Sequence, residues 1–366
     1  MRWKDCHLTY CLNVHPGDDL SSVRRAVRGP AAEVKSRICP EALFGLGLRL
    51  SAAAAGELES DVEGFRRELE GAGMYAFTIN GFPYGRFHGA PVKEDVYDPD
   101  WSRPERLDYT RRLAAILAGL LPDGVTGSIS TVPVGYEGGG EEDALANLVD
   151  AAGFCRQLME ETGREVVLAL EPEPDCRLST TDDAVEFWRR VRGAGSEETL
   201  RHLGVCLDCC HAACEFEPPV AALRRLEEAD IRVPKVQISA APVLKRGVDP
   251  VRELAPFDED VYLHQTRVMS DGKVQRFTDL PAALRSRPDG EWRVHFHVPL
   301  HFDPPGRLGT TAELLDEEFL SRATTPGRHL EIETYSFNVL PGGGGELVES
   351  VCDEFDWLLQ RLPHSV

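Results

Sequence analysis

The stretch VCLDCCHAA, residues 205–213, places an aspartate at the end of an apolar run and a histidine three residues later. Successive side chains of a strand point to opposite faces, so Cys206 and Asp208 share the face opposite Leu207. Asp208 then ends the strand, and His211 begins the loop that follows. The pattern predicts a polar site at the carboxyl end of a buried strand.

A structural zinc site is the alternative interpretation of the same cysteine-rich stretch. Cys206 and Cys209 form one CxxC, but on a strand they point to opposite faces, and the chain has no second CxxC. The ten cysteines are spread over 366 residues, which is not the pattern of a small disulfide scaffold. We expect most of them to be reduced and buried.

Two further acidic residues end strand-like runs. Glu171 follows VVLAL, and Glu333 follows HLEI. If these strand ends meet Asp208, the three carboxylates repel one another and do not all ionise unaided, and a divalent cation offsets that repulsion. Oxygen ligands with one amide or imidazole suit Mn²⁺, Mg²⁺ or Co²⁺ and suit Zn²⁺ less well. The alternative is that each acid caps the helix after it.

Histidines in the second half of the chain are further candidates. His295 and His297 in VHFHVP lie two residues apart, so on a strand both side chains point to one side. His264 in YLHQT is a candidate for the same pocket. For each of them the alternative is a structural histidine whose hydrogen bonds are satisfied inside the core.

The segment FPYGRFHGAPVKED forms a long loop after Asn80. Its aromatic and basic side chains, among them His88 and Lys93, together with Asn80, are expected to form a wall of the substrate site. The alternative is a packed surface loop.

Eight apolar runs of strand type position these residues. They lie at 7–14, 44–51, 75–81, 127–134, 166–174, 203–209, 233–240 and 329–336. Amphipathic helical patterns of about 10–20 residues lie between them. This alternation predicts an α/β fold, a (β/α)8 TIM barrel, with reactive groups at the carboxyl ends of its strands. A doubly wound open sheet is the alternative, but no GxGxxG follows the first strand.

Residues 241–310 hold additional strand-like segments, two of them joined by the turn sequence SDGK. We expect a β-rich insertion between the seventh and eighth barrel strands that lies over the barrel mouth. The chain, residues 1–366, is predicted to be a single domain, because α/β barrels with insertions reach this length.

The composition excludes some classes of partner. Acidic residues outnumber basic ones 61 to 40, a formal net charge of -21, which disfavours binding to nucleic acid or to an anionic membrane. The longest apolar run, LAAILAGLL at 113–121, falls short of the roughly 20 residues that a membrane span needs. The first residues lack the apolar region of a signal peptide, so a cytoplasmic location is predicted.

The motifs ALEPEP, CLDCCH and EIETY, in this order, resemble those of the xylose-isomerase-like TIM barrels. That superfamily includes sugar isomerases, ketose epimerases and apurinic-type endonucleases. Over nearly the whole chain, segments such as HLTYCLNVHPG, FTINGFPYGRFHG and WRVHFHVPL are similar to the EboE family of bacterial "metabolite traffic" proteins.

The superfamily resemblance implies one divalent metal ion, Mn²⁺, Co²⁺, Mg²⁺ or Zn²⁺. In the sugar epimerases its ligands are a Glu, an Asp, a His and a Glu from strands five to eight. Glu171, Asp208 and Glu333 match the first, second and fourth of these ligands. Strand seven has Gln237 in place of the histidine, so either Gln237 or His297 would complete the site.

The same resemblance implies an isomerase or epimerase of a sugar, cyclitol or related polyol that acts through an enediolate. Glu171 and Glu333 would remove and return the proton next to the carbonyl, and His211, which matches a histidine that contacts the substrate, would bind a substrate oxygen. Arg49, Lys93 or Arg86 would hold a distal phosphate if the substrate has one. Pathway proteins or a second copy of the chain are the protein partners we expect.

Two other classes of function stay open. A non-catalytic barrel that binds or hands over a metabolite is favoured by Gln237 and by the traffic family. A metal-dependent hydrolase would use the cation to activate water. An apurinic-type endonuclease would need a histidine-rich zinc site and a basic groove, which the negative charge disfavours.

Overall fold

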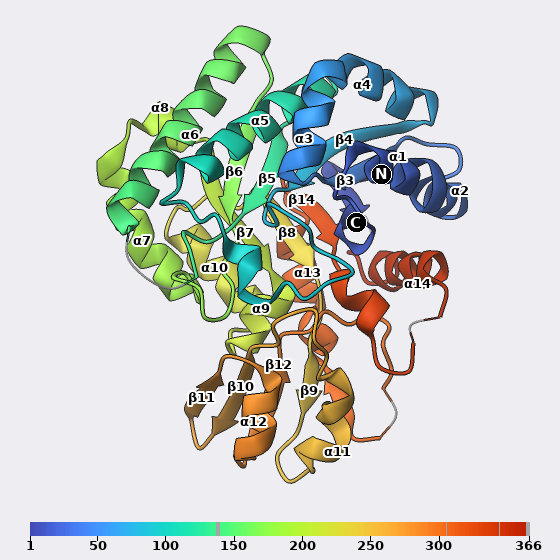
Figure 1. The fold of residues 1–366 in the computed structure, drawn as a ribbon, viewed down its shortest axis with the longest axis vertical. Helices are drawn as coiled ribbons and strands as arrows, with labels where there is room; N and C mark the ends of the chain where they lie inside the picture. The colour runs from blue at the N-terminus through green and yellow to red at the C-terminus, as the bar shows by residue number, and fades with distance from the viewer. Residues whose placement is uncertain (137–139, 305, 344, 364–366) are drawn as a thin grey trace.

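The computed structural model describes residues 1–136, 140–304, 306–343 and 345–363. Eight parallel strands follow one another around a barrel in chain order (Figure 1). They are β2 (Cys6–Tyr10), β3 (Phe44–Arg49), β4 (Met74–Asn80), β5 (Gly127–Thr131), β6 (Val166–Leu170), β7 (Leu203–Asp208), β8 (Lys235–Ile238) and β14 (His329–Ile332). Each lies within one of the eight predicted runs or overlaps it, so the predicted TIM barrel is confirmed.

The barrel is nearly closed. Its nine-stranded sheet begins with the short antiparallel strand β1 (Arg2–Trp3) beside β2 and ends at β3. A parallel bridge between Cys11 and Gly47 joins these two ends. Glycine is required at this closure, because a Cβ on Gly47 would lie 1.8 Å from Glu331 Oε1.

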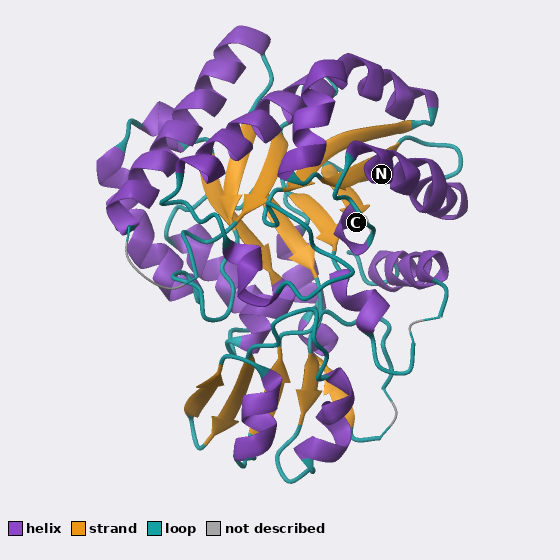
Figure 2. Cartoon of the chain, viewed as in Figure 1, coloured by secondary structure: helices purple, strands orange, loops and turns teal. Residues whose placement is uncertain are grey.

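Helices surround the strands (Figure 2). They are α1 (Leu20–Ala26), α2 (Ala32–Ile38), α3 (Ala52–Leu58), α4 (Val62–Gly71), α5 (Pro104–Leu120), α6 (Glu141–Thr162), α7 (Thr181–Ala194), α8 (Glu197–Leu200), α9 (Cys209–Cys214), α10 (Pro219–Glu228), α13 (Glu317–Ala323) and α14 (Leu347–Leu359). Every residue of β4, β6 and β7 is buried, because helices cover one face and the barrel interior lies on the other. This burial explains the nearly continuous apolar runs.

The chain between β8 and β14 forms the predicted β-rich insertion. Its strands form an antiparallel sheet in the order β11-β10-β12-β9-β13. The elements are β9 (Pro242–Leu244), α11 (Pro250–Leu254), β10 (Thr266–Ser270), β11 (Lys273–Phe277), α12 (Leu280–Ser286), β12 (Glu291–Val294) and β13 (Leu308–Thr310). In Figure 1 this sheet lies beyond the carboxyl ends of the barrel strands. Residue 305 of the predicted insertion is outside the described residues.

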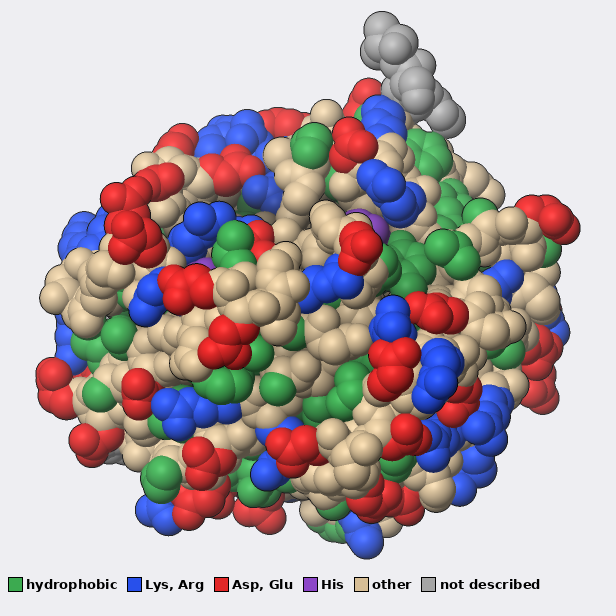
Figure 3. All heavy atoms as spheres, turned by 90° about the horizontal axis from the view of Figure 1, so that it is seen from above, with side chains coloured by type: hydrophobic (Ala, Val, Ile, Leu, Met, Phe, Trp, Pro, Cys, Tyr) green, Lys and Arg blue, Asp and Glu red, His purple; other side chains and the backbone are tan. Residues whose placement is uncertain are grey.

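The surface mixes both signs of charge. On the face shown in Figure 3, Lys and Arg side chains lie among Asp and Glu side chains, so the acidic excess does not form one uniform patch there. In the described part of the chain, no helix combines the length and the apolar character that crossing a bilayer requires.

A buried arginine fastens the insertion to the barrel. The Nε atom of Arg267, on β10, donates to Glu215 Oε1 at 2.7 Å, and its Nη2 donates to Asp175 Oδ1 at 2.6 Å. Asp175 belongs to the loop after β6, and Glu215 follows α9. The Arg267 side chain is fully buried, so these charge-assisted hydrogen bonds are shielded from water.

We expect Arg267→Ala to lower the free energy of unfolding by about 3–5 kcal/mol, because it leaves Glu215 buried without its partner. Arg276→Ala is the matched control, since this exposed side chain contacts the other oxygen of Glu215 at 3.4 Å. Its loss should cost about 1 kcal/mol or less. Urea unfolding at pH 7 measures both, and equal losses would contradict the assignment.

A buried carboxyl joins α14 to the barrel mouth. Glu354 Oε1 accepts hydrogen bonds from the backbone N–H of Leu300 at 3.1 Å and from Thr334 Oγ1 at 2.7 Å. Burial raises the pKa of Glu354 from 4.5 to about 7, although both hydrogen bonds act to lower it. The folded protein therefore binds this proton more tightly than the unfolded chain does, and ionisation of Glu354 destabilises the fold.

Because the folded pKa is the raised one, the stability linked to Glu354 is complete below about pH 4.5 and is lost as the pH rises through about 7. Glu354→Gln keeps the acceptor oxygen and cannot ionise, so we expect it to stabilise the protein at pH 8 by about 2–3 kcal/mol relative to its effect at pH 4. Chemical unfolding at the two pH values measures the difference. An equal effect at both would show that the carboxyl does not titrate in this range.

Candidate metal centre

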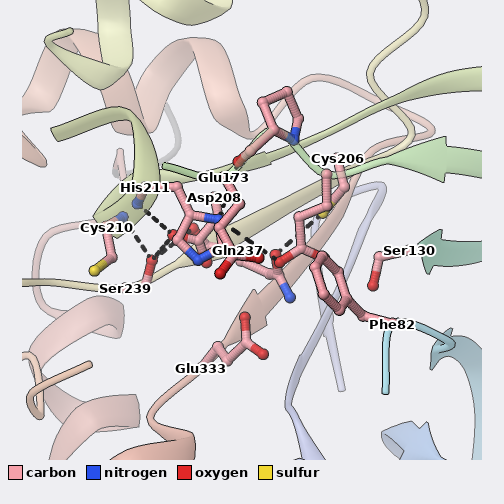
Figure 4. Close-up of polar contacts among 12 residues, drawn as sticks. Phe82, Ser130, Glu173, Cys206, Asp208, Cys210, His211, Gln237, Ser239 and Glu333 are labelled. Carbon is pink, nitrogen blue, oxygen red and sulfur yellow. Dashed lines mark hydrogen bonds and ion pairs between the residues drawn. The ribbon is translucent and has the colours of Figure 1, made fainter. Parts of the chain in front are cut away.

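Three buried carboxylates meet at the carboxyl ends of the barrel strands. Figure 4 shows two of them, Asp208 and Glu333. Glu171 directly follows β6, Asp208 ends β7, and Glu333 directly follows β14. Their side chains offer ligand oxygens that all lie within 4.8 Å of one another. The residues are only 3%, 1% and 3% exposed. The structure thus brings together the three acids that the sequence places at strand ends.

Neighbouring side chains hold one oxygen of two of these carboxylates. Asp208 Oδ1 accepts from the backbone N–H of His211 at 2.9 Å and from Ser239 Oγ at 2.8 Å. Glu333 Oε1 accepts from the amides of Asn13 and Asn80. Asp208 therefore does cap the helix that follows it, α9, as the alternative interpretation expects.

The second oxygen of each carboxylate has no hydrogen bond to the described residues. Glu171 Oε2, Asp208 Oδ2 and Glu333 Oε2 are buried and have no hydrogen-bond partner among the described residues. A buried carboxylate oxygen without a donor is unfavourable, and a divalent cation bound by all three would satisfy them together. The donor set therefore fits a divalent cation with oxygen ligands.

The pKa values of the three acids shift in different directions. Burial raises the pKa of Glu171 to about 8, with the charge of Asp208 adding to the rise and His211 opposing it. Burial and the charges of Glu171 and Asp208 hold the pKa of Glu333 well above its ordinary value. Burial acts to raise the pKa of Asp208 as well, but His211 and His297 outweigh it and lower that pKa. Asp208 thus carries the permanent negative charge.

Three histidines border the carboxylates. The ring centroid of His211 lies 4.6 Å from that of His295 and 5.3 Å from that of His297. His295 and His297 were predicted to lie on a strand, and this prediction is wrong, because β12 ends at Val294. The backbone N–H of Phe296 donates to the carbonyl of Val294, and the chain turns there. Both imidazoles still face the site.

Gln237 lies beside Asp208 in the register of β7 and β8. Its Oε1 accepts from Cys206 Sγ at 3.2 Å, and its Nε2 has no partner in the described part of the chain. A 180° rotation of the amide would exchange the two atoms, so Gln237 keeps its candidacy as a ligand. Cys206 and Cys209 belong to no potential ligand group found among the described residues.

A cavity of about 50 Å³ lies against Glu171, Glu333 and His211. Its wall is aromatic, and both the loop after β4 and the insertion contribute to it. The aromatic lining residues are Phe82, Phe87, Tyr97, Tyr262 and Tyr335. The insertion therefore contributes to the wall of this cavity.

Of the predicted substrate-binding residues, Asn80, Lys93, His211 and His295 line this cavity. The ammonium group of Lys93 is already engaged, since it donates to the carbonyl of Tyr262 at 2.6 Å and lies 3.0 Å from Asp279 Oδ2. Lys93 thus connects the loop after β4 to the insertion.

The other three predicted substrate-binding residues, Arg49, His88 and His264, are not among the lining residues. Each has a protein partner. Arg49 Nη1 donates to Asp18 Oδ1 at 2.9 Å, His88 Nδ1 lies 2.7 Å from Tyr262 Oη, and His264 Nε2 lies 2.8 Å from Glu259 Oε1. These contacts engage all three side chains away from the lining of the cavity.

Two polar residues at or near the cavity, Tyr97 and Gln265, were not predicted from the sequence. Tyr97 Oη donates to Glu173 Oε1 at 2.6 Å, and Gln265 Nε2 donates to Tyr97 Oη at 2.8 Å. Gln265 Oε1 then lies 2.7 Å from His295 Nδ1. Tyr97 belongs to the long loop after β4. The aromatic residues of this loop were the one feature of the sequence that could have pointed to Tyr97.

Neither a protein-family model nor a curated protein matches this sequence. In structure, the chain is similar to a xylose isomerase domain protein from Planctomyces limnophilus, with a TM-score of 0.51, 12% identity, and coverage of 97% of this chain and 95% of that one. An IolI protein with a bound zinc atom (TM-score 0.49, 12% identity, 98% and 100% covered) was also found. A further match is a xylose isomerase-like TIM barrel protein from Mycobacterium smegmatis in complex with magnesium (TM-score 0.49, 13% identity, 96% and 98% covered). At such low identity the first likeness shows the fold alone, that of a xylose-isomerase-like TIM barrel.

Proposed function

We propose that the chain is a divalent-metal-dependent isomerase or epimerase of a sugar, cyclitol or related polyol. The observation that carries the proposal is the convergence of Glu171, Asp208 and Glu333, each with one buried oxygen free of hydrogen bonds to the described residues. A cation held there, with Mn²⁺, Mg²⁺ or Co²⁺ favoured by the oxygen ligands, would polarise a substrate carbonyl and stabilise an enediolate.

Glu171 and Glu333 are the groups that move the proton. Both line the cavity, whereas Asp208 is not among the lining residues. Burial raises the pKa of both glutamates in the absence of a cation, to about 8 for Glu171. The amides of Asn13 and Asn80 hold Glu333 Oε1 and so fix the orientation of the carboxyl group in the site.

His211 is placed to bind a substrate oxygen. Its Nδ1 donates to the carbonyl of Pro172 at 3.0 Å, which leaves Nε2 for the site. The aromatic wall suits the C–H faces of a ring or a carbon chain. Lys93 is the one Lys or Arg among the described lining residues, and it is engaged by Tyr262 and Asp279. This arrangement supports an uncharged substrate rather than a phosphorylated one.

A non-catalytic metabolite-binding barrel is the second candidate. Gln237 occupies the position where an imidazole ligand is expected, and its Oε1 accepts from Cys206. An amide binds a cation more weakly than an imidazole or a carboxylate. The similarity of the sequence to the EboE family of metabolite-traffic proteins supports the same alternative.

We expect the protein with Mn²⁺ to exchange a carbon-bound hydrogen for deuterium in at least one member of a panel of ketoses and keto-cyclitols. Glu333→Gln should slow this exchange about 100-fold or more, because an amide cannot carry the proton. Proton NMR in D₂O measures the exchange. Glu161→Gln, on the exposed side of α6, is the control and should keep the wild-type rate.

Calorimetry on the same panel separates the two candidates. Binding of a polyol with no exchange in the presence of Mn²⁺ would contradict catalysis and favour the metabolite-binding barrel. Urea unfolding of Glu333→Gln verifies that a lost rate does not reflect a lost fold.

A further inference from the structure

The cavity at the carboxylate site is closed in this structure. Its volume is about 50 Å³, which is room for a few water molecules, whereas cavities that bind small organic ligands measure about 300–1,000 Å³. Glu171 and Glu333 line this cavity and are each 3% exposed. A polyol therefore reaches these carboxylates only if part of the cavity wall moves.

The part of the wall that is free to move lies in the long loop after β4. Residues 86–96 of this loop belong to no strand and no α-helix, and the chain is anchored on both sides of them. On one side the carbonyl of Tyr84 accepts from the backbone N–H of Ala52 at 2.8 Å, and on the other Tyr97 Oη donates to Glu173 Oε1 at 2.6 Å. We call residues 86–96, which lie between these anchors, the lid.

The lid closes against two other segments through aromatic rings. Phe87 of the lid, Tyr262 of the insertion and Tyr335 after β14 all line the cavity. The ring centroid of Phe87 lies 5.3 Å from each of the other two, which are 5.0 Å apart, and His88 Nδ1 lies 2.7 Å from Tyr262 Oη. With Val92, the three rings form a cluster separate from the main hydrophobic core. A small separate cluster opens more readily than part of the main core.

Hydrogen bonds tie the lid to the insertion. The backbone N–H groups of Val92 and Lys93 donate to the carbonyl of Val261 at 2.7 and 3.2 Å. The ammonium group of Lys93 donates to the carbonyl of Tyr262 at 2.6 Å and lies 3.0 Å from Asp279 Oδ2. The side chains of Lys93 and Asp279 are 28% and 23% exposed, so water competes for this ion pair and the contact is reversible.

The backbone conformation of Lys93 favours opening. Its φ is 41°, in the left-handed region that is unfavourable for a residue with a long side chain. The contacts with the insertion offset this cost while the lid is closed, and opening relieves it. Lys93 thus holds the closed lid through both its backbone and its side chain.

We propose that residues 86–96 are a lid over the carboxylate site, that Lys93 latches this lid to the insertion, and that the lid opens to admit the cation and the substrate. Val261, Tyr262 and Asp279, which hold the latch, all belong to the insertion, so control of access is a role for that segment. A closed lid also keeps bulk water from an enediolate. This last role rests on the proposed isomerase, whereas the opening of the lid does not.

Amide hydrogen exchange, resolved to single residues, tests the lid without a ligand. The amide of Val92 should be at least about 100-fold less protected than that of Gly81, which follows β4 and donates to the carbonyl of Ser130. Lys93→Met should lower the protection of Val92 about 10-fold further and leave Gly81 unchanged, because the lost hydrogen bond has a charged donor. Lys245→Met, at an exposed lysine of the insertion, is the matched control and should change neither amide.

Three results would overturn the lid. Val92 would be as well protected as Gly81 in the wild type, or Lys93→Met would leave Val92 unchanged. The third is a loss of protection at Gly81 as large as that at Val92, which would show that Lys93→Met destabilises the barrel and does not release a local segment.

Release of Mn²⁺ measures the opening through its effect on the site. Protein loaded with Mn²⁺ is mixed with excess EDTA, and free Mn²⁺ is replaced by its EDTA complex as the site empties. Lys93→Met should speed this release about 10-fold and change the dissociation constant less than about 3-fold, because a lid alters entry and release alike. An unchanged rate would contradict the latch. A wild-type protein that binds no Mn²⁺ would refute the proposed metal centre, and the amide exchange would still decide the lid.

Discussion

The mutual repulsion of three buried carboxylates is the constraint on which the barrel mouth depends. Glu171, Asp208 and Glu333 come from three different strand ends, and their oxygens lie within 4.8 Å of one another away from water. Burial, together with the neighbouring carboxylates, raises the pKa values of the two glutamates. A divalent cation bound among the three acids would offset their repulsion.

In the barrel interior beneath the site, a buried carboxylate is neutralised by a separate ion pair. Lys235 and Glu331 are both fully buried, and Lys235 Nζ lies 2.5 Å from Glu331 Oε2. Lys235 also donates to Ser130 Oγ at 3.2 Å. Because this pair largely cancels its own charge, the negative charge near the mouth is that of Asp208, the one of the three acids whose pKa is lowered. Gly47 leaves the space that Glu331 occupies.

Sequence patterns predict the parts of this site that local structure determines. A strand covered on both faces must be apolar along its length, so the polar residue that ends it is visible in the sequence, and Glu171, Asp208 and Glu333 were identified in this way. The positions of His295 and His297 were not predictable to the same degree. Their orientation depends on a turn after β12 and on the docking of the whole insertion by Arg267, and both are long-range effects.

The cavity wall shows the same limit. The aromatic loop after β4 was predicted to form a wall of the substrate site. Which of its polar side chains are free to bind a substrate depends on contacts with residues distant in the chain, and the sequence does not reveal these contacts. Lys93 contacts Asp279, and His88 contacts Tyr262. In the sequence both side chains are candidates for binding a substrate, but in the fold each one binds a protein partner. Tyr97 is held at the cavity by hydrogen bonds with Glu173 and Gln265, which lie on other segments.

Anomalous diffraction from crystals grown with Mn²⁺ tests the central claim most directly. The account predicts an anomalous peak at the manganese edge between the carboxylates of Glu171, Asp208 and Glu333, at about 2.0–2.4 Å from an oxygen of each. A structure in which Mn²⁺ is saturating and no peak lies among these three residues, or in which the peak lies elsewhere on the protein, would contradict it.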